Sequence, residues 1–247
     1  MSILSPNKNN IVLSVKRGAF RSDDPTSEES DSVFKSVRPK ILERDNFTCQ
    51  FCSFRSLKYQ EVHHLDDDHS NNDEGNLITT CALCHSCFHI GLSGTFGRGD
   101  IIRLDPGLGV SQAELNQLIR VLWLAEESTE QSIKMIAVKN LARFNKQTVS
   151  ADRKLGTTDP LVIGDWLLQL SDSDYEKRAL ILSEYYFLPK KSGYTAQFNY
   201  WKESVFKSIP SSDWLAISNQ KLESWAKNKH GDASPESILS ALQRKRV

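Results

Sequence analysis

The chain of 247 residues is long enough for one large domain or two modest ones. Its 31 basic and 31 acidic residues cancel, so the composition gives no broad electrostatic footprint for nucleic acid or an acidic membrane surface. No apolar run approaches the roughly 20 residues of a membrane-spanning helix, and the first residues lack the apolar core of a secretory signal. We therefore expect a cytoplasmic protein that does not insert directly into a membrane.

Residues 1–32 are expected to hold a strand followed by an acidic loop. The stretch "IVLSVKRGAF" at 11–20 alternates enough in hydropathy for a strand, and 21–32 is polar and rich in turn formers. A short helix is predicted over 33–46, in which Pro39 either causes a kink or starts a second helical piece. The apolar face of this helix comprises Val33, Phe34, Val37, Ile41 and Leu42.

The segment from residue 33 to residue 110 is predicted to alternate turns with short regular elements. We expect a knuckle-like turn around the first two cysteines and a strand at 59–65. The stretch 66–75 is a loop of turn-forming residues, and 76–92 is predicted to enter a short helix. A hairpin or edge strand at 94–109 then completes this unit.

The remaining residues, 111–247, are predicted to form an α-helical domain. Ser111 and Glu114 make a capping box, in which a hydroxyl and a carboxylate each satisfy a backbone N–H at the start of a helix. Apolar residues then recur at helical spacing, at Leu115, Leu118, Ile119, Leu122 and Trp123. Further helices are expected at 130–146, 160–170, 173–187, 196–206, 211–229 and 234–246. Most Trp and Tyr side chains should enter the core, leaving a few for a partner-binding surface.

All five cysteines lie between positions 49 and 87. Without an export signal the thiols are expected in a reducing compartment, where paired cysteines indicate metal ligands before disulfides. Two Cys-x-x-Cys knuckles, separated by 28 residues, offer four thiolates to a structural Zn²⁺. Their members are Cys49, Cys52, Cys81 and Cys84. Cys87 is an extra thiol, which either replaces one of these ligands or is buried or free.

Five of the six histidines lie in the same region, although a four-sulfur zinc site needs none of them. His63 and His64 are adjacent on the predicted strand, so their side chains point to opposite faces. His85 and His89 stand four residues apart, so a helix would project both rings from one face toward a shared ion. His69 lies in the acidic loop and is expected to be solvated. The alternative for all these rings is that they only pack or form hydrogen bonds.

The motifs between residues 37 and 92 resemble the HNH nuclease family and its ββα-metal fold. They are "ILERDNFTCQFC", "VHHL", "NL" and "CALCHSCFH", which are specific in combination. The resemblance implies that His64 is the general base and that Asn76 orients it. It also implies ligands for a catalytic divalent ion, Mg²⁺ or another, at His63, His85 and His89. The base would accept a proton from water while the ion stabilises charge on the phosphate. The "DDDH" loop departs from the family pattern, which carries Pro and Gly there.

A longer run of motifs resembles the DotN (IcmJ) family of type IVB secretion systems. It includes the "LSVK" and "YQEV" strands and the second knuckle followed by another Cys, and it extends through "GDIIRLDP" and "SQAELNQLIRVLW". The resemblance covers about the first 125 residues. It implies an HNH-like, zinc-containing adaptor that binds the cytoplasmic C-terminal tail of the coupling ATPase, DotL, together with other coupling-complex subunits. Such a protein would be peripheral to the inner membrane through its partners.

These observations predict an α+β fold, an HNH-like zinc domain followed by helices, and leave its function open between classes. We favour a zinc-stabilised adaptor of a secretion or conjugation coupling complex. The alternative is an active metal-dependent DNA endonuclease that uses His64 as its base, so enzymatic activity stays undecided by the sequence. A nucleic-acid-binding zinc protein ranks third, because the chain carries no basic stripe.

Overall fold

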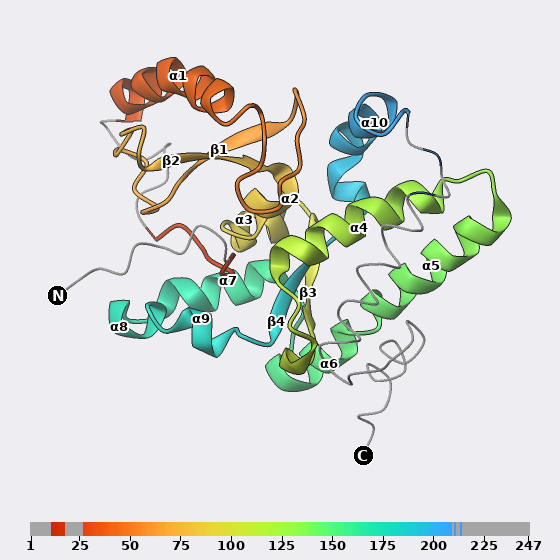
Figure 1. Cartoon of the computed structure of the whole chain (residues 1–247). Helices are drawn as coiled ribbons and strands as arrows, with labels where there is room; N and C mark the ends of the chain where they lie inside the picture. Colours follow the sequence, from red (N-terminus) through yellow and green to blue (C-terminus); the bar gives the residue numbers. More distant parts are fainter. Residues whose placement is uncertain (1–10, 18–26, 209, 211–212, 214–247) are drawn as a thin grey trace.

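The computed structural model describes residues 11–17, 27–208, 210 and 213 (Figure 1). These residues form helices and two small antiparallel sheets, so the predicted mixture of α and β structure is confirmed. One sheet pairs β1 (Gln60–His64) with β2 (Leu77–Cys81), and the other pairs β3 (Gly99–Arg103) with β4 (Tyr185–Pro189). None of the helices in the described ranges is both long and apolar enough to cross a bilayer.

Helix α1 (Ser27–Arg44) lies over the β1–β2 sheet (Figure 1). It begins inside the stretch predicted to be a loop and continues across Pro39, so no second helical piece starts at that residue. The predicted apolar face is buried at its C-terminal end, where Ile41 and Leu42 pack with Val62 and Leu77. Burial of this end against the sheet offsets the backbone hydrogen bond that proline removes.

The stretch 76–92, predicted as the entry to one helix, contains three elements. Strand β2 comes first, and α2 (Ala82–Ser86) and α3 (Ile90–Thr95) follow it. The sequence "LITTC" is rich in β-branched residues and short, so periodicity alone does not distinguish a strand from a helix there. Pairing with β1, which was correctly predicted as a strand, decides in favour of the strand.

The helices after residue 111 agree with most of the sequence-based predictions. Ser111 and Glu114 form both hydrogen bonds of the capping box at the start of α4 (Gln112–Glu126). Close to the predicted limits are α5 (Gln131–Asn145), α7 (Pro160–Gln169) and α10 (Thr195–Glu203), whereas α6 (Thr148–Leu155) was not predicted. Helix α7 packs on α3 where a Cβ on Gly164 would lie 2.7 Å from Gly91 Cα, so the contact needs glycine. The helices predicted over 211–229 and 234–246 lie outside the described residues, apart from residue 213.

The helix predicted over 173–187 is wrong in its second half. Only two short helices form, α8 (Asp172–Tyr175) and α9 (Arg178–Ile181), and the chain then enters strand β4. Two tyrosines and a phenylalanine begin β4, and aromatic residues favour strands where a partner edge is available. That edge is β3, which was predicted as a strand or hairpin but pairs with a segment more than 80 residues away. The predicted domain boundary at residue 110 therefore lies, along the chain, between β3 and β4, two strands that pair in one sheet.

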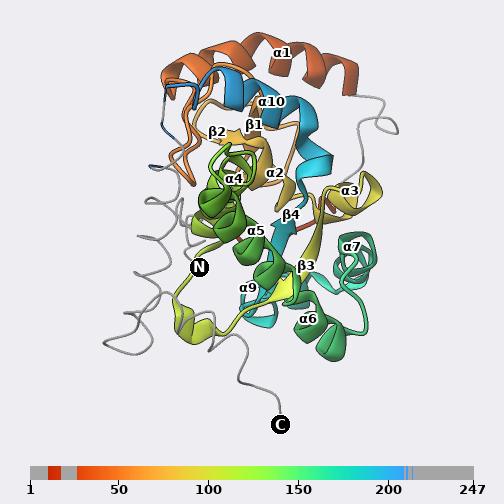
Figure 2. The ribbon, with the colours of Figure 1, turned by 90° about the vertical axis from the view of Figure 1, so that its right-hand side faces the viewer.

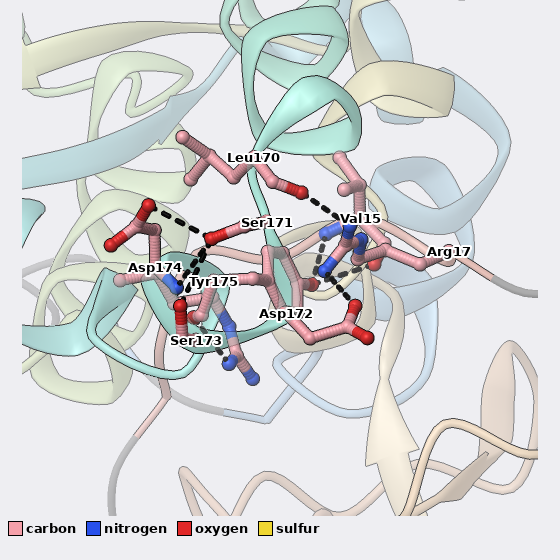
Figure 3. Close-up of polar contacts among 9 residues, drawn as sticks. Val15, Arg17, Leu170, Ser171, Asp172, Ser173, Asp174 and Tyr175 are labelled. Atoms are coloured by element: carbon pink, nitrogen blue, oxygen red, sulfur yellow. Dashed lines mark hydrogen bonds and ion pairs between the residues drawn. The ribbon is translucent and has the colours of Figure 1, made fainter.

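The strand predicted over 11–20 is absent from residues 11–17, and 18–20 lie outside the described residues. Instead, an irregular segment runs between α3 and α9, where Ser14 N donates to Cys87 O and Ser14 O accepts from Ile90 N. Figure 3 shows how α8 holds this segment: Tyr175 Oη accepts from Val15 N at 3.1 Å and donates to Val15 O at 2.7 Å. These bonds satisfy the backbone as a sheet partner would.

Candidate metal centres

The four knuckle cysteines meet at one point in the interior. Their sulfur atoms all lie within 4.8 Å of one another, and the Sγ atoms of Cys52 and Cys81 are 3.6 Å apart. A tetrahedral Zn²⁺ with metal–sulfur bonds of about 2.3 Å has sulfur–sulfur edges of about 3.8 Å, so the set fits such an ion. All four side chains are 2% exposed or less, and every thiol is free of disulfide bonding. The cluster can therefore hold a metal ion shielded from solvent.

Local backbone geometry aims these thiols at one another. In the first knuckle Ser53, with a φ of 57°, donates its N–H to Cys49 O, and Cys49 N donates to Phe54 O. Gln50 N donates to Thr79 O, which fastens this knuckle to β2. In the second, Cys81 ends β2 and Cys84 lies in the first turn of α2. A tight turn and a strand-to-helix junction thus bring four ligands from two distant places to one centre.

The four buried thiols cannot all ionise together unless a cation binds to them. Burial raises the pKa of Cys81 and Cys84 well above that of an ordinary thiol. Burial also opposes ionisation of Cys49, yet hydrogen bonds from the neighbouring thiols hold its pKa well below the ordinary value. Four thiolates would repel one another so closely packed, and a divalent ion removes that repulsion by binding all four.

Cys87 lies beside this set and is not one of its members. It is fully buried, and its thiol donates to Leu83 O at 3.4 Å. Burial raises the pKa of Cys87, so the group stays protonated and apolar in character. Cys87 was expected either to replace one of the four ligands or to be a buried or free thiol, and in the structure it is a buried thiol.

The three predicted histidine ligands also converge. His63 comes from β1, His85 from α2, and His89 from the residue just before α3, and each offers a ring nitrogen within 4.8 Å of the others. Burial, followed by the neighbouring imidazoles, lowers the pKa of His63 to about 2, and the same causes lower that of His89 to about 3. Both rings are neutral at pH 7 and present lone pairs, as metal binding requires.

A carboxylate that sequence reasoning missed supports this cluster. Glu61 Oε2 lies 2.6 Å from His85 Nδ1, which leaves Nε2 as the nitrogen that can bind an ion. A carboxylate behind a metal-bound histidine fixes the tautomer and raises the basicity of the ligand. Glu61 and His63 are two residues apart on β1 and so share one face of the strand. That alternation was the signal in the sequence.

His64 points to the opposite face of β1 from His63, as predicted. Its Nε2 lies 3.1 Å from Asn72 Oδ1, and its ring stacks on that of His69 with centroids 4.7 Å apart. Asn76, predicted to orient His64, uses its side chain elsewhere: Nδ2 donates to Asp66 Oδ1 and Asn71 O, and Oδ1 accepts from Asp66 N. Asn76 therefore shapes the acidic loop, and Asn72 is the asparagine beside the ring.

The histidines line a cavity of about 400 Å³. His64, His69, His85 and His89 contribute to its wall, together with the basic side chains of Lys16 and Arg38. His69, which was expected to be solvated, is half-buried here. The cavity thus brings together two of the three possible metal ligands, the predicted base, two basic side chains and the Glu61 carboxylate. Such a combination is suited to a metal ion with an anionic ligand beside it.

Type 4 apparatus protein DotN from Legionella pneumophila subsp. pneumophila is 33% identical to the chain over 190 residues, which is 74% of this chain and 86% of that protein. The chain belongs to the DotN family. The family resemblance inferred from the motifs is thereby confirmed, and it reaches beyond the first 125 residues because 190 residues are aligned. No family model matches the chain.

In this DotN-family chain, the helical half also contributes to the cysteine cluster, which the sequence did not indicate. Arg120 Nη2 on α4 donates to Cys81 Sγ at 3.1 Å, and Asn116 Nδ2 donates to Cys84 Sγ at 3.4 Å. Helix α4 packs against α2, which carries Cys84, and the two helices lie next to each other in both views (Figure 1, Figure 2). Nothing in the local sequence of α4 marks them, because their partners are more than 30 residues away.

Proposed function

We propose that the chain is a component of a type IV secretion apparatus, a zinc-stabilised, HNH-like adaptor that docks on the cytoplasmic tail of the coupling ATPase. The observation that carries this proposal is the 33% identity to a type 4 apparatus protein over 86% of that protein's length. In this proposal the protein stays in the cytoplasm and reaches the inner membrane only through its partners, which include other coupling-complex subunits.

The arrangement of the molecule supports different roles for two ranges of the chain, one that holds the metal and one that binds the partner. Residues 33–110, with the four-cysteine cluster, would serve as the zinc-holding scaffold, and residues 111–247 would supply the partner surface. Apolar side chains are exposed on two helices of that second part: Trp166 on α7 is 42% exposed, and Leu180 on α9 is 77% exposed. Large exposed apolar side chains are frequent at protein-binding surfaces.

Calorimetry with the full-length chain and the C-terminal tail of the coupling ATPase from the same organism tests the adaptor role. We expect saturable binding by the wild type and at least tenfold weaker binding by Trp166→Ala or Leu180→Ala. Met135→Ala, which truncates an apolar side chain on α5 whose exposure of 61% lies between those of Trp166 and Leu180, serves as the matched control. If the wild type does not bind the tail at all, the adaptor proposal is wrong. If only Met135→Ala weakens binding, the tail uses the α5 face instead.

A second candidate function is a metal-dependent HNH DNA endonuclease. The convergence of His63, His85 and His89 favours it, because a cluster with a carboxylate on one ring and a cavity beside it resembles a catalytic more than a structural site. In this hypothesis His64 is the general base, and Asn72 takes the orienting role first given to Asn76. The ion would be Mg²⁺ or another divalent metal, and three imidazoles favour the transition metals.

Plasmid nicking in Mg²⁺, Mn²⁺ and Ni²⁺ tests this second candidate. An enzyme should lose at least 100-fold of its rate in His64→Ala and in His89→Ala, since the base and the ion each contribute that much. Glu74→Gln is the matched control, because Glu74 is exposed on the same loop and does not line the cavity. Cleavage that is equal in the wild type and in His64→Ala would come from a contaminating nuclease, and the hypothesis would be abandoned.

A further inference from the structure

Arg120 is a buried cation without a carboxylate partner. Its side chain is only 3% exposed, and in the described part of the chain no Asp or Glu forms an ion pair with it. Its guanidinium lies over the ring of Phe54 at 3.7 Å and over that of Trp201 at 5.1 Å. A buried charge of this kind is strongly destabilising unless another charge compensates it.

Within the described ranges, the hydrogen-bond acceptors that the Arg120 guanidinium reaches are sulfur atoms. Arg120 Nη2 lies 3.1 Å from Cys81 Sγ and 3.9 Å from Cys52 Sγ, one cysteine from each knuckle. Four thiolates around a divalent ion carry a net charge of about −2, which also needs compensation in an apolar interior. The positive guanidinium and the negatively charged metal centre therefore compensate each other's charge in the apolar interior.

The same helix makes further contacts with the knuckles. Asn116 Nδ2 donates to Cys84 Sγ, and Gln117 Nε2 donates to Cys52 O. On the far side of the guanidinium, Phe54 from the first knuckle meets Trp201 of α10 edge to face, with centroids 5.2 Å apart. Arg120 thus stands at the point where the cysteine cluster, α4 and α10 touch.

We propose that Arg120 is the counter-charge of the zinc centre, and that it couples metal occupancy to the docking of α4 and α10 on the knuckles. This inference rests on the zinc part of the proposed function. A bound ion would hold Cys52 and Cys81, which come from the two knuckles, in the places where both sulfur atoms accept from the guanidinium. Without the ion nothing joins the two knuckles at their sulfur atoms, and α4 loses the paired acceptors that offset the burial of Arg120. Metal loading then controls whether the helical half presents an ordered surface to a partner.

Zinc affinity of full-length variants tests the counter-charge. Competition with a chromophoric chelator should give a zinc dissociation constant roughly 10- to 100-fold weaker for Arg120→Met than for the wild type, the range found when outer-shell partners of metal ligands are removed. Arg120→Lys keeps the charge and should recover most of that loss. Leu124→Ala, which truncates a buried apolar residue on the same helix, should lower the melting temperature while leaving zinc affinity within threefold.

Hydrogen exchange on the wild type tests the coupling without any substitution. Zinc removal should speed exchange at least tenfold in α4 and α10, while α7, which packs on α3, should change much less. Unchanged exchange in α4, or zinc affinity within twofold of wild type in Arg120→Met, would overturn the inference. A wild type that binds no zinc would instead overturn the proposed zinc scaffold, so the two failures can be told apart.

Discussion

The cysteine cluster and the histidine cluster share one supporting unit but have opposite surroundings. Cys84 and His85 are neighbours on α2, yet the first side chain is fully buried and the second is partly exposed. The thiols are enclosed by two knuckles and by α4, and a buried guanidinium faces them. His85 and His89 border a cavity, and the Glu61 carboxylate, which contacts His85, lines the same cavity.

This difference in surroundings determines what role a metal ion can have in each cluster. A zinc site with four sulfur ligands is complete, so its ion contributes to folding free energy and leaves no position for a substrate. A site with three nitrogen ligands beside a cavity leaves at least one position for water or an anionic ligand. The comparison predicts that damage to the first cluster costs stability, and that damage to the second costs binding alone.

The largest effect is expected from removing a thiol. Cys84→Ser should abolish metal binding at the cysteine cluster and unfold the β1–β2–α2 unit, because a structural zinc site contributes on the order of 10 kcal/mol. Cys87→Ser is the matched control, since Cys87 is equally buried on the same turn but lies outside the four-sulfur set. Circular dichroism and metal analysis measure both variants. A Cys84→Ser protein that keeps its metal and its melting curve would remove the structural role.

Removing an imidazole should affect metal binding without unfolding the chain. His89→Ala is expected to lose the second ion, with affinity for Co²⁺ or Zn²⁺ reduced at least 100-fold. Its melting temperature should stay within about 4 °C of wild type, because no sulfur ligand is touched. Visible spectra of the Co²⁺-loaded protein separate the nitrogen site from the sulfur site. If His89→Ala unfolds as readily as Cys84→Ser, the proposed contrast between the clusters disappears.

A smaller effect is expected from the carboxylate behind the histidines. Glu61→Gln keeps the shape but weakens the hydrogen bond to His85, so affinity at the nitrogen site should fall roughly 10-fold, at the low end of such effects. Isothermal titration of Co²⁺ into zinc-loaded protein measures this change. Glu74→Gln, on a loop away from the cluster, is the control. An unchanged Co²⁺ affinity in Glu61→Gln would mean that the Glu61 carboxylate does not support metal binding by His85.

The smallest effect concerns an aspartate near the cavity. Burial raises the pKa of Asp67 to about 6, although Lys16 and Arg178 favour its charged form. Because the folded protein holds this proton more tightly than the unfolded chain, Asp67 lowers stability increasingly as the pH rises through 6. Asp67→Asn should therefore raise the unfolding free energy by about 1 kcal/mol at pH 8 and by almost nothing near pH 4. Asn also tolerates the positive φ of 63°.

Denaturant titrations at the two pH values measure this difference. Asp68→Asn is the neighbour control: hydrogen bonds from Ser70 lower the pKa of Asp68, so its loss should reduce stability at pH 8 where loss of Asp67 increases it. Opposite signs for the two adjacent aspartates would show that the penalty for burying a carboxylate falls on Asp67 and not on Asp68. The same sign for both would mean that burial does not penalise the Asp67 carboxylate.

The sequence by itself determined the features that depend on short separations. The two knuckles, the capping box at Ser111, and the alternation that puts His63 and His64 on opposite faces all follow from spacing within a turn, a helix or a strand. The same local rules failed where a distant partner intervened. "YYFLP" became β4 only because β3 offers it an edge. Asn72 rather than Asn76 lies at His64 because the loop folds back on Asp66.

Only the tertiary structure decided what surrounds the two clusters. Arg120 reaches Cys52 across 68 residues, and no pattern in α4 distinguishes it from an arginine on the surface. The pairing of Glu61 with His85 likewise depends on the packing of β1 against α2. Spacing along a chain fixes which ligands can share an ion. Burial and charge at that ion are set by elements far apart in sequence, because core packing brings them there.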